Sequence, residues 1–448
     1  MKRFSLSLLV ASMMFGLATQ AASAQSLPEL YESARAYDAS FLSVKAQFDA
    51  TVALADQAKA SILPTIGFSS TISRSDFAPN IGFGTGVSAA ERYFGNRSYG
   101  ISLAQPLYRP GNLASYNQGQ KQLMLADAQL QAAEQDLMVR LSQAYFDVLS
   151  STNNLTLVRV QKTAVAEQLA SAKRNFEVGT STITDTNEAQ ARFDLSRAQE
   201  IAAENEVRIK QLALNTLVGK PVDPYGLRSS AALPTLKDAD MNQWVDASQD
   251  THPTIRLAQM ALDVAVLEND KSRAGHKPTL DGFISINNNA NIAGSVAGNA
   301  MTDSRYLLSQ AGITLTIPIF AGFATQNRLK QTLALEEKAR NDLENAKRTV
   351  AQATRTAYFG VLSGVSSVSA YEAAEKSSQS ALDSNKLGYQ VGVRINIDVL
   401  NAQSQLYQTK RDLAAARYNV LLGQLKLRQA NGSLKQADLD AIGALLTK

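Results

Sequence analysis

Several short segments of the chain alternate between apolar and polar residues. In the segment 66–74, Ile66, Phe68 and Ile72 fall on one side, and small or polar residues such as glycine, serine and threonine fall on the other. A period of two is typical of a β-strand with one apolar face. We expect Pro106 to end one such strand, because proline has no N–H to donate to a sheet. The pattern predicts two pairs of strands, at about 65–75 and 98–106 and at about 279–288 and 306–318.

The segments between the strands have helical spacing and few helix breakers. From about Asn112 to Phe176 there is no proline and one interior glycine, Gly119, so a helix here would be roughly 95 Å long. Its apolar residues alternate between steps of four and three, the spacing of a left-handed coiled coil, and Lys162 interrupts the series. This predicted seam consists of Leu137, Leu141, Ala144, Val148, Ser151, Leu155, Val158, Val165, Leu169, Ala172 and Phe176.

The chain uses this arrangement of elements twice. Residues 144–150 (AYFDVLS) return as 357–363 (AYFGVLS), and 176–179 (FEVG) return as 389–392 (YQVG), with an offset of 213 residues in both cases. A repeat of this size is one structural half used twice, each half reading as helix, strand, strand, long helix and shorter helix. We expect the helices at 27–61, 112–176, 185–218, 323–387 and 398–430. The chain then divides into a first repeat at 25–220, a non-helical connector at 221–240, a second repeat at 241–432 and a C-terminal tail at 433–448.

The first residues have the features of an export signal. Lys2 and Arg3 precede an apolar stretch from Leu6 to Leu17, and Ala22-Ser23-Ala24 resembles a cleavage site. The apolar stretch is shorter than the roughly 20 residues of a spanning helix, so we predict a signal peptide at 1–24. The chain has no cysteine, which excludes a lipid-anchored lipoprotein and a disulfide framework.

Charge and hydropathy narrow the class of protein further. The formal net charge is +4, or +2 without Lys2 and Arg3, which argues against a nucleic-acid partner. No apolar run after the signal is long enough for a spanning helix, but strands of about nine residues can cross a membrane. Four strands cannot close a barrel, and lipid does not tolerate open sheet edges, so membrane strands require several copies of the chain. The alternative is a small soluble antiparallel sheet.

The sequence offers no catalytic or metal-binding constellation. The two histidines, His252 and His276, each lie near a proline. A metal site requires further ligands such as a second histidine or a set of carboxylates, and neither histidine has them nearby in the sequence. The glycine-rich segment 82–86 lacks the spacing of a phosphate-binding loop and does not open a helix. We therefore expect neither an enzyme nor a bound metal or cofactor.

The two half-repeats behind a signal peptide resemble the TolC family of outer-membrane channel proteins. The resemblance covers essentially the whole mature chain and is most specific at 176–185 and 389–402. It implies a mainly α fold with membrane β-strands, in which three protomers give four strands each to a 12-stranded β-barrel and their helices to a long α-helical periplasmic barrel. It also implies a homotrimer in the outer membrane that exports drugs or proteins, as in tripartite efflux or type I secretion. Its partners would be a periplasmic adaptor protein and an inner-membrane ABC or proton-driven transporter.

The resemblance further assigns roles to the two tight turns that each join a long helix to the shorter helix after it. In the family, these turns lie where the channel narrows and the adaptor docks. Thr184 and Asp185 match positions that accept bonds from a tyrosine and an arginine of the second turn, here Tyr389 and Arg394; these bonds would hold the channel closed. Asp398 matches an acidic ring at the constriction, whereas Asn401 stands where some members are acidic, which puts a second acidic ring in doubt. The residues that would meet the adaptor are Val178, Gly179, Thr180, Val391, Gly392 and Val393.

The residues of the turns also have simpler interpretations. A glycine after a helix is a common C-cap, and Tyr, Arg and Asp near a turn often make cap and surface contacts. At the level of the whole chain, two other functions fit part of the pattern: an exported coiled-coil spacer without a pore, and an adaptor subunit. An adaptor would show one hairpin inside a lipoyl-like β-domain, whereas this chain shows duplicated hairpins and paired strands.

Overall fold

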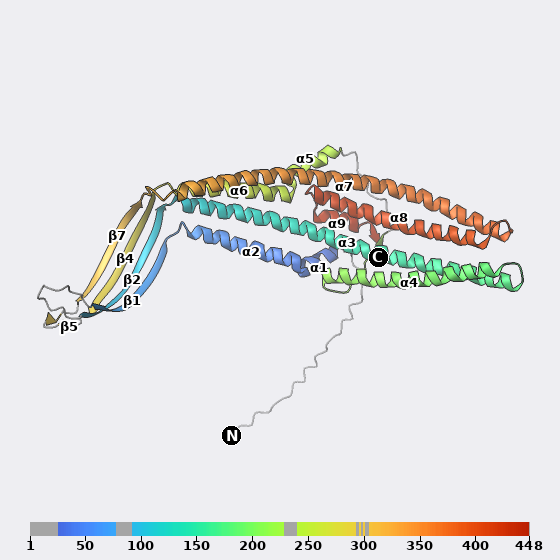
Figure 1. The fold of residues 1–448 in the computed structure, drawn as a ribbon, viewed down its shortest axis with the longest axis horizontal. Helices are drawn as coiled ribbons and strands as arrows, with labels where there is room; N and C mark the ends of the chain where they lie inside the picture. Colours follow the sequence, from blue (N-terminus) through green and yellow to red (C-terminus); the bar gives the residue numbers. More distant parts are fainter. Residues whose placement is uncertain are drawn as a thin grey trace, which may run out of the picture. The chain divides into compact units, whose positions relative to one another are not determined.

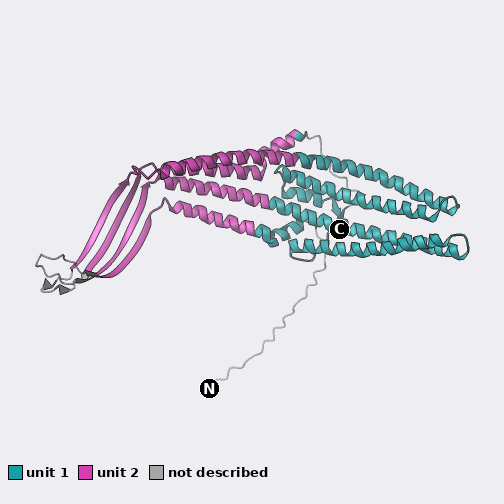
Figure 2. Cartoon of the chain, viewed as in Figure 1, with its two compact units in different colours: residues 1–42, 134–241, 355–448 teal, residues 43–133, 242–354 magenta. Residues whose placement is uncertain are grey.

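The computed structural model describes residues 26–77, 92–227, 240–292, 295–296, 299–300 and 304–447. The predicted signal peptide at 1–24, the glycine-rich segment 82–86 and most of the predicted connector lie outside the described residues. The chain divides into two compact units (Figure 2). Unit 1 comprises residues 1–42, 134–241 and 355–448, and unit 2 comprises residues 43–133 and 242–354. Each unit therefore draws on both sequence repeats.

Unit 2 contains a sheet of four long antiparallel strands in the order β1-β2-β4-β7 (Figure 1). The strands are β1 (Thr65–Phe77), β2 (Arg92–Tyr108), β4 (Thr279–Ile292) and β7 (Ser304–Thr316), at the places that the alternation predicts. The expectation that Pro106 ends its strand is wrong. β2 continues to Tyr108, and its register against β4 shifts between Pro106 and Tyr108. A bulge of this kind accommodates a residue that has no N–H.

One side of this sheet consists of large apolar side chains that nothing covers in the described chain. Phe68 of β1 lies opposite Ile101 of β2, which in turn lies opposite Ile286 of β4. All three side chains are exposed, as are Ile66 and Ile72 on the same side of β1. A water-soluble sheet buries such a face against a second layer. The short strands β5 (Ser295–Val296) and β6 (Asn299–Ala300) form a separate two-stranded pair.

The helices of unit 2 are α6 (Pro253–Ala274), most of α2 (Ala39–Ala60) and α5 (Met241–Thr251), and the first parts of α3 (Pro110–Glu177) and α7 (Ala324–Gln390). α2 packs tightly on α3, because a Cβ at Gly119 would lie 2.9 Å from the Cβ of Ala58. His252 begins α6, and its Nδ1 accepts a hydrogen bond from the Thr254 amide (3.1 Å). Among the helices that the structure describes, none combines the length and the apolar character needed to cross a membrane.

Unit 1 contains α1 (Leu27–Tyr37), the remainder of α3 and α7, and the return helices α4 (Ile183–Val218) and α8 (Asn396–Ala430). The predicted single helix at 27–61 is in fact two helices. The Oδ1 atom of Asp38 accepts a hydrogen bond from the Phe41 amide (2.8 Å) and so starts α2, as a capping carboxylate does. Arg140 of α3 donates to both oxygens of Asp38 at 3.1 Å, which holds the pKa of that carboxyl below its usual range.

The predicted coiled-coil seam forms much of the core of unit 1. Most of the seam is buried, but Phe176 at its end is exposed. Lys162, the interruption, forms an ion pair with Glu200 of α4, so the charge is compensated across the helix pair. The buried members are Leu137, Leu141, Val148, Ser151, Val165, Leu169 and Ala172.

The C-terminal residues complete unit 1. α9 (Gln436–Gly443) packs against α1, with Leu439 fully buried. β8 (Leu446–Thr447) pairs with β3 (Gly226–Leu227). The predicted tail at 433–448 is thus folded as far as Thr447.

Candidate functional site

The first turn, residues 178–182, joins α3 to α4. Gly179 has a φ of +78°, a left-handed conformation that favours glycine. Its amide donates to the Phe176 carbonyl (3.0 Å), and the Thr180 amide donates to the Asn175 carbonyl (2.8 Å). These two bonds define a Schellman motif, which satisfies the last carbonyls of a helix. Val178 beside the glycine is exposed.

The second turn, residues 391–395, joins α7 to α8 with the same geometry. Gly392 has a φ of +82°, and its amide donates to the Tyr389 carbonyl (3.2 Å), while the Val393 amide donates to the Gly388 carbonyl (2.9 Å). Val391 and Val393 are both exposed. The internal repeat of the sequence is therefore matched by the same pattern of backbone hydrogen bonds in the two turns.

The two turns differ at the start of the helix that follows. Thr182 caps α4: its Oγ1 accepts from the Asp185 amide (3.2 Å), and the Asp185 carboxylate accepts from the Thr182 amide (3.0 Å). Ser181 Oγ donates to the same carboxylate (2.7 Å). Burial pushes the pKa of the Asp185 carboxyl up, but these bonds outweigh it and hold the pKa below its usual range. The Asp185 carboxylate therefore stabilises the first turn and the start of α4.

The equivalent aspartate of the second turn has no such role. Ile395 stands at the position of Thr182, and its side chain makes no cap hydrogen bond. Asp398 instead lies 3.8 Å from the guanidinium of Arg394, a contact between two partly exposed groups that contributes little to stability. The Arg394 side chain also covers Gly388, where a Cβ would lie 2.6 Å from the Cγ of Arg394.

A buried asparagine holds the two turns together. Asn396, the first residue of α8, donates from Nδ2 to the Asp185 carbonyl (3.3 Å) and accepts from Nε2 of Gln168 on α3. Asn175 near the end of α3 donates to the Tyr389 hydroxyl (3.3 Å). These bonds join α3, α4, α7 and α8 at one place. Sequence reasoning missed Asn396 and Gln168, although a polar residue directly after an exposed turn is a usable signal.

The predicted gate residues do not meet within one chain. Tyr389 packs against the cluster of Leu382, Val399 and Leu406, and Thr184 is exposed. In the part of the chain that the structure describes, no hydrogen bond or ion pair joins Asp185 to Tyr389 or to Arg394. The carboxylate of Asp185 is taken by Ser181 and Thr182, and the guanidinium of Arg394 lies nearest to Asp398.

Asn401, the predicted departure from an acidic ring, has a cationic partner. Its Oδ1 accepts a hydrogen bond from Nη2 of Arg192 on α4 (2.8 Å). An amide stands at this position, and the positive charge of Arg192 lies beside it. Arg192 carried no signal in the sequence, because a lone arginine on a polar helix is typical of a solvated face.

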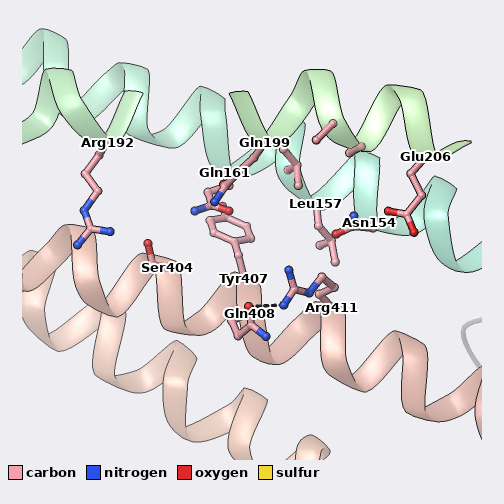
Figure 3. A pocket seen from close by; sticks show the side chains of 13 residues that line it. Asn154, Leu157, Gln161, Arg192, Gln199, Glu206, Ser404, Tyr407, Gln408 and Arg411 are labelled. Carbon is pink, nitrogen blue, oxygen red and sulfur yellow. Dashed lines mark hydrogen bonds between the residues drawn. The ribbon is translucent and has the colours of Figure 1, made fainter. Parts of the chain in front are cut away.

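Arg192 also lies at one end of a groove between α3, α4 and α8 with a volume of about 410 Å³ (Figure 3). The Oδ1 atom of Asn154 is buried there, and it has no hydrogen-bond partner among the described residues. The groove is lined by Asn154, Leu157, Val158, Gln161, Arg192, Gln199, Ala202, Ala203, Glu206, Ser404, Tyr407, Gln408 and Arg411. Across the described residues, no cluster of His, Cys, Asp and Glu side chains could hold a metal ion.

Comparison with known proteins places the chain in a family. The outer membrane efflux protein family matches residues 30–220 and 244–433, one segment for each repeat. The chain is 32% identical to the outer membrane protein TolC of Vibrio cholerae over 442 residues, 97% of each chain. It is also 32% identical to the alkaline protease secretion protein AprF of Pseudomonas aeruginosa, over 77% of this chain and 71% of AprF.

Solved structures show the same fold. The match to CusC has a TM-score of 0.77 at 17% identity and covers 91% of this chain and 92% of that one. The match to the outer membrane protein VceC of Vibrio cholerae has a TM-score of 0.73 at 18% identity, with 91% and 96% covered. The chain therefore belongs to the outer membrane efflux protein family, whose members are export channels. Its place is the outer membrane, with helices that extend into the periplasm.

Proposed function

We propose that three copies of this chain form a conduit through the outer membrane, which receives its cargo from a periplasmic adaptor protein and an inner-membrane transporter. The observation that carries this proposal is the four-stranded sheet of unit 2. Its apolar face is exposed, and β1 and β7 each pair on one side only among the described strands. Lipid covers an apolar face but does not satisfy backbone groups, so the edges of several copies must pair with each other.

The class of cargo is drugs or proteins. One relative is named for the secretion of a protease, and another, from Brucella suis, is named an efflux protein, while the same architecture serves both. A conduit of this kind need not recognise what it passes. We propose a transport role without catalysis, and we retain the predicted repeats at 25–220 and 241–432 as the two structural halves of the chain.

The two turns form the proposed gate. Because Asp185, Thr184, Tyr389 and Arg394 do not meet within one chain, the proposed gate links run between neighbouring copies, and Asp398 lines the constriction. The exposed valines beside the two glycines, Val178, Val391 and Val393, would meet the adaptor. Support comes from their placement: each valine projects from a corner whose backbone is fixed by a Schellman motif. The docking residues are Val178, Gly179, Thr180, Val391, Gly392 and Val393.

The gate hypothesis is tested by the double substitution Tyr389→Phe and Arg394→Ser. Single-channel conductance in planar bilayers should rise, because two links per copy are removed. Tyr407→Phe, a tyrosine on α8 outside the turns, serves as the control and should leave conductance unchanged. A folded oligomer of the double variant with the conductance of the unmodified protein would remove the gate, and a purified protein that forms no channels would favour the spacer function.

A further inference from the structure

The apolar side of the sheet in unit 2 changes character along the strands. Register partners on neighbouring strands point to the same side of a sheet, so each set of partners forms one row across it. Near the helices the rows of this side are apolar, with Leu280 opposite Leu315 and, farther along, Ile101 opposite Ile286. At the other end of the strands the same side carries arginines.

Two of these arginines lie in one row. Arg97 of β2 and Arg305 of β7 are the register partners of Ala290, which lies between them on β4. Arg97 also lies opposite Ile72 of β1, whose side chain is 77% exposed. Both arginines are exposed, and neither side chain forms a hydrogen bond or an ion pair within the described chain. The row therefore combines two uncompensated positive charges with apolar neighbours.

The length of the strands places this row at one edge of the apolar band. From Leu315 to Arg305 is ten residues along β7, about 34 Å, or about 26 Å along the membrane normal for a strand tilt of about 40°. The apolar band of an outer-membrane sheet is about 25 Å tall. Tyr99, one row nearer the helices than Arg97, is 50% exposed, and aromatic residues border such a band.

The connection to the helices identifies which edge this is. β2 ends at Tyr108, directly before α3 begins at Pro110, so the helices join the strands at the end opposite the arginines. Because the helices extend into the periplasm, the row of Arg97 and Arg305 lies in the outer leaflet. An arginine is costly at the midplane of the bilayer but is tolerated at the interface, where lipid phosphates are.

Other charged residues of the sheet do not compensate this row. Asp281 lies on the other side of the sheet, where Arg109 donates to both of its oxygens at 2.7 Å. Arg74 lies on the apolar side one row beyond Arg97, and Asp76 occupies the next row of β1. We therefore assign no part of the site to Arg74.

The small residue between the two arginines leaves room for a ligand. Neighbouring strands are about 4.8 Å apart, so the backbones of Arg97 and Arg305, separated by β4, are about 10 Å apart. Between them the side chain of β4 is the methyl group of Ala290. Two long side chains can both reach a group placed over this methyl, and the guanidinium fork matches phosphate oxygens.

We propose that Arg97 and Arg305 bind the phosphate of an outer-leaflet lipid over Ala290. This inference rests on the proposed function, because it takes the apolar side of the sheet to face lipid. Each copy of the chain carries one such site. The ligand is a component of the membrane rather than cargo, and it holds the outer edge of the sheet at the level of the headgroups.

Lipid binding to the purified protein tests the site. The probes are lipid A with two phosphates and the same lipid after a phosphatase has removed both. Native mass spectrometry counts the lipids that the protein retains after purification in detergent. The test variant is Arg97→Gln with Arg305→Gln. The control that removes the same charge is Arg340→Gln with Arg348→Gln, two exposed arginines of α7.

We expect the unmodified protein to retain the phosphorylated lipid, up to one molecule per copy, and to lose the dephosphorylated one. The affinity of the test variant for the phosphorylated lipid should be roughly 30-fold lower, because each basic residue beside an anionic lipid contributes about a fivefold factor. The control variant should bind as the unmodified protein does.

A second pair of variants tests the position of the phosphate and keeps both arginines. Ala290→Phe fills the space between them and should weaken binding. Asn288→Phe adds the same ring one row nearer the helices, between Tyr99 and Leu307, and should leave binding unchanged. Full binding by Ala290→Phe would overturn the placement over Ala290.

The inference is overturned if the protein retains both forms of the lipid equally, a comparison that needs no variant. It is also overturned if the Arg97 and Arg305 variant binds as tightly as the control, or if an equimolar amount of inorganic phosphate displaces the lipid, which would indicate a site for free anions. Each of these outcomes leaves the proposed function intact, provided that the unmodified protein floats with phosphatidylcholine vesicles and forms channels in them. A protein that does not enter such vesicles would refute the proposed function and this inference together.

Discussion

Replacing Asn396 by alanine is expected to release the second turn from the first. Asn396 is 1% exposed, and it makes one hydrogen bond to the Asp185 carbonyl and one to Gln168. A typical neutral hydrogen bond contributes about 1 kcal/mol net, so the loss is about 2 kcal/mol in each copy. This corresponds to a roughly 30-fold shift in the equilibrium for local opening of the turn.

Hydrogen exchange with mass spectrometry measures this opening directly. Amides in peptides that cover 392–403 should exchange up to about 30-fold faster in the Asn396→Ala variant, and the conductance of single channels should rise with it. Asn431→Ala is the matched control. Asn431 is 4% exposed and caps the other end of α8, where its side chain accepts from Ser433.

The control should accelerate exchange around residue 431 without affecting the second turn. If exchange at 392–403 is unchanged in the Asn396 variant, these two bonds do not hold the turns together. If both variants accelerate it equally, the effect is a loss of global stability, and the reasoning from local contacts is refuted.

Three further predictions concern the caps and the acid response. Thr182→Ala should speed exchange at the start of α4 by a factor that corresponds to about 1 kcal/mol, and Thr182→Ser should restore the unmodified rate. Gly392→Ala should lower the free energy of unfolding by about 1–2 kcal/mol because of its positive φ, while Gly360→Ala, in open space within α7, should raise it slightly. Because Arg140 lowers the pKa of the Asp38 carboxyl, the stability from this pair is present above the unfolded pKa of about 3.9 and is lost as the pH falls through the lowered value. The free energy of unfolding, measured at a series of pH values from 7 to 3, should therefore fall less steeply with decreasing pH in Asp38→Asn than in the unmodified protein. The same pH dependence in both proteins would contradict the assignment.

Local signals in the sequence located the four long strands and the long helices, but not α5, α6, α9 or the short strands. Period-two alternation located the strands, and the repeat located the corresponding helices in the second half. Two local errors have physical reasons. A bulge lets β2 continue past Pro106. Asp38 divides the first helix because it caps α2, and an aspartate before a helical stretch is a recognisable capping signal in a sequence.

The contacts that organise the candidate site could not be predicted from local signals. Gln168 and Asn396 are 228 residues apart in the sequence, and Arg192 and Asn401 are 209 apart. These pairs depend on how the hairpins lie side by side, which no periodicity specifies. The gate links and docking residues came from the resemblance to the family, and they stay predictions, because the structure contains one chain.

The difference between Thr182 and Ile395 has a consequence for how the duplicated halves diverged. After a gene segment is doubled, one descendant can keep the ancestral chemistry while the other accumulates change at no cost to the whole. Here Ile395 has no hydroxyl where the first repeat has Thr182, so the carboxylate of Asp398 takes no part in capping α8. Position 398 can therefore change under selection without the loss of a helix cap, at the cost only of a weak contact with Arg394.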